Sequence, residues 1–281
     1  MNVTARDGTR LAVHTAGNGP GVLCVPGGPG RAARYLEDLG GLAATRTLHL
    51  LDNRGSGDSE LPADRGSLAF PRLADDVEDV RAALQPPPTA ILGHSAGCPV
   101  VLLHAARYPE AVRRVVLVTP SGRPFGWTAD DLEPIRASRS GEPWYGEAAE
   151  AAAMSATASP ALRSELDRVM RPLWYGRWDE RTQAHANSAD DQVSLRAAAG
   201  YVPGPDYDPA AALQSLGAIT ARVLVVVGEV DALTGVSVAK RFAEVLPNCE
   251  VASIGGAGHF PWVDQPEAFR DAVDGFLSRS D

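Results

Sequence analysis

A serine stands between two glycines at residues 93–97, which read Gly-His-Ser-Ala-Gly. The apolar run before it, residues 89–92, predicts a buried strand, and the helical spacing of apolar residues at 100–105 predicts a helix after it. A sharp turn between a strand and a helix exposes a serine hydroxyl, and flanking glycines allow the backbone to make that turn. The first N–H groups of the helix favour negative charge nearby. The motif therefore predicts that Ser95 acts as a nucleophile.

A serine nucleophile needs a base, and His259 has the position for it. His259 follows a predicted strand through a flexible loop at residues 255–258, Gly-Gly-Ala-Gly. The carboxyl ends of parallel strands lie at one edge of a sheet, so this loop and Ser95 are expected on the same side. His94 is adjacent to Ser95, but neighbouring side chains in a strand point to opposite faces, which argues against it. His185, in a segment without predicted strands, is the alternative base.

The base in turn needs an acid that orients its imidazole. Asp231 lies in the loop after the predicted strand at residues 223–227, between the serine and the histidine in the chain. Glu229, two residues earlier, is the alternative. We expect Asp231 to be the orienting acid.

The oxyanion that forms during attack needs two backbone N–H donors. One is expected from Ala96, the residue after the nucleophile. The second is expected from the loop at residues 26–30, Pro-Gly-Gly-Pro-Gly, where we favour Gly28 because glycine lets the backbone approach a substrate. This loop has neither the Gly-x-Gly-x-x-Gly spacing of dinucleotide sites nor the Lys-Ser/Thr pair of phosphate-binding loops. We therefore expect catalysis without a cofactor.

Around these residues, predicted strands alternate with predicted helices. The chain opens with a hairpin whose turn is Asp7-Gly8. Further strands are predicted at residues 21–25, 47–51, 89–92, 115–118, 223–227 and 251–254. Helices are predicted at residues 73–84, 100–105, 238–245 and 267–276, and a helical pattern passes through residues 35–39. The alternation predicts an α/β fold with a mostly parallel central sheet and helices on both faces.

The alternation stops between residues 121 and 216. This segment contains four of the five tryptophans and reads as several helices without strands. A structureless loop of this length would be unusual in a compact domain. We expect a core domain formed by residues 1–120 and 217–281, with residues 121–216 inserted as a helical lid.

Composition limits the possible partners. The 281 residues carry a net charge of −9, which argues against nucleic acid and against an anionic membrane surface. Cys24, Cys98 and Cys249 are odd in number and widely spaced, so free thiols in a reducing compartment are expected, and no Cys/His cluster suggests zinc. The first eight residues lack the apolar core of a signal peptide, and no apolar run reaches membrane-spanning length. We expect a cytoplasmic protein.

Together these residues resemble α/β-hydrolases of the proline iminopeptidase type, which are serine aminopeptidases (peptidase family S33 type) with a helical lid. The His-Gly-Gly-Pro-Gly loop of that family appears at residues 26–30, and its Asp-x-Arg-Gly-x-Gly-x-Ser motif is intact at residues 52–59. The order Ser…Asp…His also matches. Two departures from the pattern stand out. Pro26 replaces the loop histidine, and His94 and Ala96 stand in an elbow that usually reads Gly-Gly-Ser-Trp-Gly. That elbow looks more like those of general esterases and C–C hydrolases.

The resemblance covers nearly the whole core and is weak across the lid. In the family, carboxylates of the lid bind the free α-amino group of the substrate, and a buried ammonium needs such a partner. The segment at residues 174–180 resembles the aromatic and acidic stretch that does this. The resemblance therefore implies that Asp179 and Glu180, beside Trp178, bind substrate.

These observations predict a hydrolase that cleaves an N-terminal aminoacyl amide of a small peptide or small molecule through an acyl-enzyme on Ser95. No cofactor or metal is needed for this chemistry, and a monomer or small homo-oligomer is expected. The alternative within enzymes is an esterase, lactonase or thioesterase with the same three residues. The alternative outside enzymes is a binding protein that has lost catalysis, which the presence of all three residues disfavours.

Overall fold

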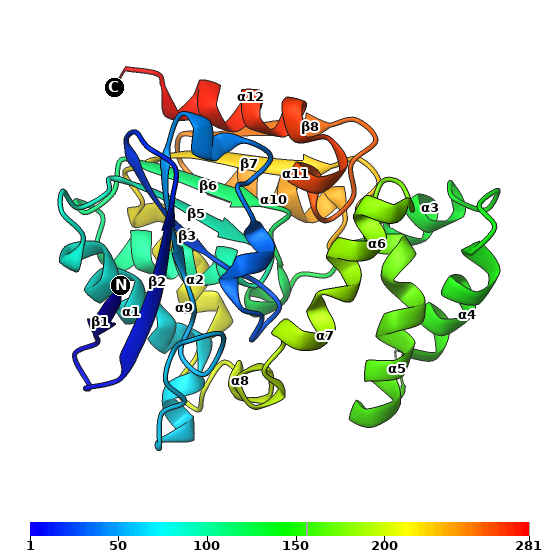
Figure 1. Cartoon of the computed structure of the whole chain (residues 1–281), viewed down its shortest axis with the longest axis horizontal. Coiled ribbons are helices and arrows are strands. Elements are labelled where there is room, and N and C mark those ends of the chain that lie inside the picture. Colours follow the sequence, from blue (N-terminus) through cyan, green and yellow to red (C-terminus); the bar gives the residue numbers. More distant parts are fainter. Residues whose placement is uncertain (156, 281) are drawn as a thin grey trace.

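The computed structural model describes residues 1–155 and 157–280 and contains one eight-stranded sheet (Figure 1). The strand order is β1-β2-β4-β3-β5-β6-β7-β8. The strands are β1 (Asn2–Thr4), β2 (Arg10–Ala16), β3 (Gly21–Val25), β4 (Thr47–Leu51), β5 (Ala90–His94), β6 (Arg114–Val118), β7 (Arg222–Gly228) and β8 (Cys249–Ile254). The pairs from β4 through β8 are parallel, whereas β2 pairs antiparallel with both β1 and β4. The predicted mostly parallel sheet is confirmed.

Helices cover both faces of this sheet, as predicted. In β6, Val115 and Leu117 pack into one apolar cluster while Val116 and Val118 pack into the other, because consecutive side chains alternate across a strand. The first cluster contains α1 (Phe70–Ala83), α2 (Gly97–Arg107) and α10 (Val236–Val245), and the second contains α11 (Pro261–Asp264) and α12 (Pro266–Leu277). Burial on both faces explains why the inner strands read as continuous apolar runs.

The prediction of a helix from the spacing of apolar residues at 35–39 was wrong. The structure has a short 3-10 helix, η1 (Ala33–Leu36), and a second one, η2 (Leu42–Ala44). Glu37 and Leu39 both have φ of 52°, and two glycines with positive φ follow at residues 40 and 41, so the backbone cannot continue a right-handed helix. The apolar side chains are nevertheless buried, and their burial produced the helical spacing.

Between β6 and β7, the described residues form helices and no strand. These helices are η4 (Arg123–Phe125), α3 (Leu132–Ala137), α4 (Tyr145–Ser155), α5 (Pro160–Met170), η5 (Arg171–Trp174), α6 (Glu180–Asn187), α7 (Ala189–Gln192), α8 (Leu195–Gly200), α9 (Pro209–Ser215) and η6 (Leu216–Ala218). Figure 1 shows α3 to α6 projecting beyond the sheet. Ala212 and Leu216 instead pack in the first core cluster, so the end of this segment lies against the core. The division into core and lid domains stays a prediction.

The sheet brings the loops that carry the candidate residues to one edge. Because β3, β5, β6, β7 and β8 are neighbours and parallel, their carboxyl ends lie side by side. The loop at residues 26–30 follows β3, Ser95 follows β5, and Asp231 and His259 follow β7 and β8. Cys24, Cys98 and Cys249 are free thiols, as expected. Within the described residues, no helix is long and apolar enough to cross a membrane.

Candidate active site

Ser95 occupies a strained turn between β5 and α2. Its φ of 52° lies in the left-handed region, which a non-glycine residue adopts at a cost of about 1 kcal/mol or more. A Cβ atom at Gly97 would lie 2.4 Å from the carbonyl oxygen of Val25, and one at Gly93 would lie 2.9 Å from that of Gly97. Glycine is therefore required on both sides of the serine. The backbone N–H of Ser95 donates to the carbonyl of Val118, which fixes the turn against β6.

Asp231 and His259 form a buried pair. The Nδ1 atom of His259 lies 3.0 Å from Oδ2 of Asp231, and neither side chain is more than 2% exposed. Burial raises the pKa of the Asp231 carboxyl, but the neighbouring His259, the Thr234 hydroxyl and the Leu233 N–H outweigh burial and hold the pKa below its ordinary value. Asp231 is therefore a carboxylate at neutral pH, and it directs the Nε2 atom of His259 away from itself.

The backbone of His259 is held from three sides. Its N–H donates to the carbonyl of Trp174 at 2.7 Å. Its carbonyl accepts from Nε2 of His94 and from Oγ1 of Thr119, each at 3.0 Å. The rings of His94 and His259 are 4.8 Å apart, and His94 adjoins Ser95 in the chain. Within the described residues, no hydrogen bond joins Ser95 to His259. In many hydrolases the hydrogen bond between nucleophile and base forms with good geometry only when substrate binds.

The loop at residues 26–30 lies against the nucleophile. A Cβ atom at Gly27 would lie 2.8 Å from Cβ of Ser95 and 3.2 Å from the N atom of Ala96. The N–H of Gly27 donates to the hydroxyl of Tyr35 at 2.7 Å. Among the described residues, the N–H groups of Gly28 and Ala96 have no hydrogen-bond acceptor. These two donors are therefore free to receive an oxyanion.

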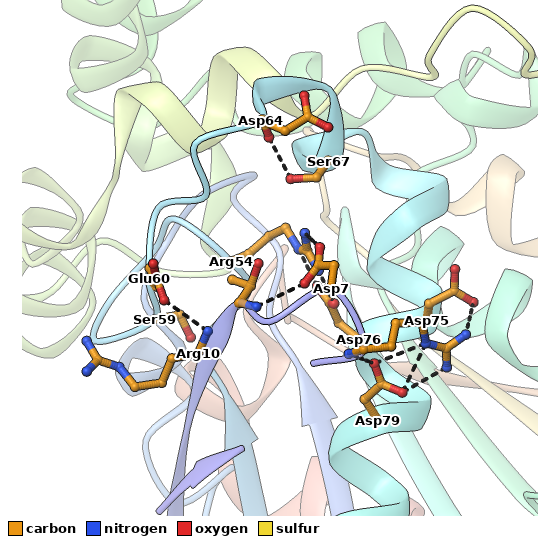
Figure 2. Close-up of polar contacts among 12 residues, drawn as sticks. Asp7, Arg10, Arg54, Ser59, Glu60, Asp64, Ser67, Asp75, Asp76 and Asp79 are labelled. Atoms are coloured by element: carbon orange, nitrogen blue, oxygen red, sulfur yellow. Dashed lines mark hydrogen bonds and ion pairs between the residues drawn. The ribbon is translucent and has the colours of Figure 1, made fainter. Parts of the chain in front are cut away.

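A narrow pocket lies between this loop and the head of α2. Its lining residues are Pro26, Gly27, Pro29, Gly30, Asn53, Arg54, Leu68, Leu73, Ala96, Ala197 and Tyr201. The guanidinium of Arg54 is neutralised, because Nε donates to Asp76 at 2.6 Å and Nη1 donates to Asp7 at 2.7 Å (Figure 2). Oδ1 of Asn53 is buried and has no partner among the described residues. The lining is mostly apolar, and it includes Ala96 but neither Ser95 nor His259.

The alternatives left open by the sequence take other places. Glu229 is exposed and bonds the hydroxyl of Ser253, so Asp231 and not Glu229 meets His259. Both ring nitrogens of His185 are engaged, by the Tyr175 hydroxyl at 2.7 Å and by a backbone carbonyl at 2.9 Å. His185 therefore has no free nitrogen to serve as a base.

Two of the predicted lid residues, Asp179 and Glu180, lie at the surface, and the third, Trp178, is half-buried. Asp179 caps α6: its carboxylate accepts from the N–H of Thr182 at 3.0 Å and pairs with Arg177 at 2.9 Å. Glu180 is exposed, and the ring of Trp178 packs against that of Tyr175. None of the three lines the pocket beside Ala96. Their role as an anchor for an amino group stays a prediction.

Sequence reasoning missed Asp264, whose carboxylate supports the histidine loop. Its Oδ2 accepts from the N–H groups of Gly258 and Gly176, each at 2.8 Å, so it ties that loop to the segment before α6. Burial raises its pKa to about 6, although the two N–H bonds oppose the rise. In the sequence, only its position five residues after His259 could have indicated that it supports this loop.

One group of side chains has the composition of a metal site. The ligand atoms of His14, Asp52 and Asp58 lie within 4.8 Å of one another. The Asp52 carboxylate already accepts from the N–H of Ala33 at 2.6 Å and from that of Asp58 at 2.9 Å, and it contacts His14 at 2.9 Å. These bonds give Asp52 the role of organising the loop at residues 52–59.

Comparisons with known proteins agree with this geometry. The sequence model of one family, described as alpha/beta hydrolase fold, matches residues 20–266. The chain is 22% identical to a proline iminopeptidase of Heyndrickxia coagulans over 273 residues, covering 93% of this chain and 92% of that protein. It is 28% identical to a pimeloyl-(acyl-carrier protein) methyl ester esterase of Chromobacterium violaceum over 269 residues, covering 94% of this chain and 96% of that protein. The crystal structure of a proline iminopeptidase from Mycobacterium smegmatis superposes with a TM-score of 0.75 at 21% sequence identity, covering 99% of this chain and 97% of that one. The structural likeness shows the fold, and the named relatives differ in the bond that they cleave.

Proposed function

The chain belongs to the alpha/beta hydrolase fold family, and on that premise we propose that it is a serine hydrolase that cleaves the ester bond of a small carboxylic ester. The observation that carries the proposal is the buried pair of Asp231 and His259, joined at 3.0 Å beside a serine with left-handed φ at the head of α2. The enzyme class follows from the site, because the fold alone supports many activities.

The proposed reaction proceeds in two steps through an acyl-enzyme. His259 takes the proton of the Ser95 hydroxyl as the oxygen attacks the acyl carbon, while Asp231 stabilises the imidazolium. The N–H groups of Ala96 and Gly28 stabilise the oxyanion. Collapse of the intermediate expels the leaving group, which takes the proton from His259. Water then attacks the acyl carbon with His259 as the base, and the second intermediate collapses by breaking the bond to Ser95, which takes the proton back from His259 as the carboxylic acid leaves. One water is added across the ester bond in all.

An aminoacyl amide is the second candidate substrate, supported by the likeness to proline iminopeptidases over nearly the whole chain. Its free ammonium would need a carboxylate that is protected from water. Asp179 is exposed and already holds the start of α6 and the side chain of Arg177. This arrangement favours the ester, which needs no such anchor.

A paired turnover assay tests the choice. Aminoacyl anilides, N-blocked anilides and simple aryl esters are compared for wild type and for Ser95→Ala, with Ser138→Ala as a control at an exposed serine. We expect the aryl esters to be preferred, and a fluorophosphonate probe to label wild type and the control but not Ser95→Ala. A tenfold preference for free-amine substrates, about 1.4 kcal/mol in the transition state, would support the aminopeptidase instead. No turnover and no labelling would refute the hydrolase itself.

The proposed setting follows from the chemistry of the chain. A small-molecule or short-peptide substrate is proposed as the only partner that the reaction needs. The three cysteines are free thiols, which supports a reducing compartment such as the cytoplasm.

A further inference from the structure

Three hydrogen bonds connect the loops on either side of the nucleophile. The N–H of Gly27 donates to the hydroxyl of Tyr35 at 2.7 Å, and that hydroxyl lies 2.6 Å from Nδ1 of His94. Nε2 of His94 lies 3.0 Å from the carbonyl oxygen of His259. Tyr35 and His94 are each 2% exposed. The chain of bonds therefore runs from the oxyanion loop, through the strand that carries Ser95, to the loop of the base.

The direction of each bond follows from the groups at its two ends. A carbonyl oxygen only accepts, so Nε2 of His94 donates to His259. In a neutral imidazole Nδ1 is then the acceptor, so the Tyr35 hydroxyl donates to it and accepts from Gly27. Burial, together with the nearby His259, holds the pKa of His94 well below its ordinary value, which keeps the ring neutral. Both ring nitrogens and the hydroxyl are satisfied in one tautomer.

We propose that Tyr35 and His94 are positioning residues that hold the oxyanion loop and the histidine loop in register with Ser95, so that the rate of acyl transfer depends on them. The inference rests on the proposed function. Neither side chain supplies a reacting atom in that mechanism, and each acts through the backbone of another residue. Tyr35 engages the N–H of Gly27 and leaves that of Gly28 for the oxyanion. His94 engages the carbonyl of the residue that serves as the base.

Small movements of these loops would displace the reacting groups. The backbone at Gly27 is so close to the nucleophile that a Cβ atom there would lie 2.8 Å from Cβ of Ser95. Misplacement by about 1 Å costs on the order of a hundredfold in rate in well-oriented enzyme sites. Two of the three residues that depart from the proline iminopeptidase pattern adjoin these loops, because Pro26 precedes Gly27 and His94 precedes Ser95.

A second buried pair offers a matched control. The hydroxyl of Tyr175 lies 2.7 Å from Nδ1 of His185, and Nε2 of His185 lies 2.9 Å from the backbone carbonyl of Tyr35. Tyr175 is fully buried and His185 is 3% exposed, so this pair resembles the first in chemistry and in burial. Within the part of the chain that the structure describes, the Tyr175 hydroxyl bonds His185 and makes no hydrogen bond to residues 26–30. Replacing either tyrosine with phenylalanine keeps the ring and removes the hydroxyl bond to a buried histidine, and Tyr35→Phe in addition removes the acceptor of the Gly27 N–H.

The experiment compares Tyr35→Phe with Tyr175→Phe on p-nitrophenyl acetate. For Tyr35→Phe we expect kcat to fall at least tenfold with KM within twofold, and inhibition by phenylboronic acid, which mimics the tetrahedral intermediate, to weaken in parallel with kcat. For Tyr175→Phe we expect kcat within twofold of wild type, although this variant also loses a buried hydroxyl bond and should have a lower melting temperature. Equal kcat losses in both variants, or an unchanged kcat in Tyr35→Phe, would overturn the inference.

A second pair of variants keeps the test decisive if Tyr35→Phe does not fold. The carboxamide of glutamine has both donor N–H groups and an acceptor oxygen, whereas leucine has neither. We expect His94→Gln to retain at least fivefold more kcat than His94→Leu at equal KM, and equal rates in the two would overturn the inference. A wild type that turns over no ester and is not labelled at Ser95 would refute the proposed function and the inference with it. An active wild type with unaffected variants would refute the inference alone.

Discussion

Replacing Asp264 with asparagine separates the cost of burying a charge from the support that the side chain gives to the histidine loop. Asp264 is 1% exposed, and Oδ2 holds the N–H groups of Gly258 and Gly176. Within the described residues, Oδ1 has no hydrogen-bond partner, and the attraction of the nearby Arg177 only partly opposes the effect of burial. Burial raises the pKa of this carboxyl from 3.8 to about 6. An asparagine oxygen can accept the same two N–H bonds and cannot ionise.

The sign of the effect follows from the direction of the shift. Because the pKa is higher in the folded state than in the unfolded chain, the carboxyl adds stability at low pH, and this stability is lost as the pH rises through about 6. A shift of about two units corresponds to about 3 kcal/mol, of which about 2 kcal/mol is lost between pH 4.5 and pH 8. Asp264→Asn cannot ionise at this position, so its stability does not fall by this amount. The free energy of unfolding of Asp264→Asn minus that of wild type should therefore rise by about 2 kcal/mol over this range.

Urea denaturation at pH 4.5 and pH 8 measures this difference, and all other ionisable groups cancel between the two proteins. Asp271→Asn is the control for the same change at the surface, because the Asp271 side chain is 72% exposed. Labelling of Ser95 by a fluorophosphonate should survive in Asp264→Asn, because the N–H of Gly258 keeps an acceptor. A difference that stays constant with pH would refute the argument from burial, and a loss of labelling at full stability would show that the charge itself supports the loop.

Three further changes have defined outcomes. Asp231→Asn should lower kcat on aryl esters by roughly a thousandfold or more, measured by single-turnover kinetics, because the amide no longer holds His259 in the reactive tautomer. Gly176→Ala should destabilise by about 2 kcal/mol or more in urea, because its Cβ would lie 1.8 Å from the carbonyl of Gly256, whereas the open position in Gly146→Ala should cost nothing. Asp179→Ala should cost about 1 kcal/mol through loss of the helix cap, with KM for aminoacyl anilides unchanged. A rise in KM confined to free-amine substrates would contradict the last expectation and support the amine anchor.

The order of strands and helices was open to prediction because the inner strands are buried on both faces. The run at residues 115–118 lies within β6 (Arg114–Val118), and residues 223–227 lie within β7 (Arg222–Gly228). The pattern at residues 35–39 misled because spacing reports which side chains are buried and not the backbone that buries them. Two turns of 3-10 helix separated by residues with positive φ buried the same side chains.

In the candidate site, the reacting residues could be predicted from local sequence, whereas the residues that support their loops depend on tertiary contacts. Ser95, Asp231 and His259 each follow a strand at its carboxyl end, so a parallel sheet brings their loops together whatever the details of packing. The supports of those loops have no such signal, because Tyr35 and His94 are 59 residues apart and Asp264 and Gly176 are 88 residues apart.

A weaker prediction was nevertheless available for His94. A histidine at the end of a buried strand needs partners for both of its ring nitrogens, since an unsatisfied buried polar group costs about 1–3 kcal/mol. The sequence therefore implied that His94 has two partners, but no spacing identified them as Tyr35 and the carbonyl of His259. Local sequence thus determines which chemistry can occur at this edge of the sheet. The accuracy with which the reacting groups are held depends on contacts between distant segments.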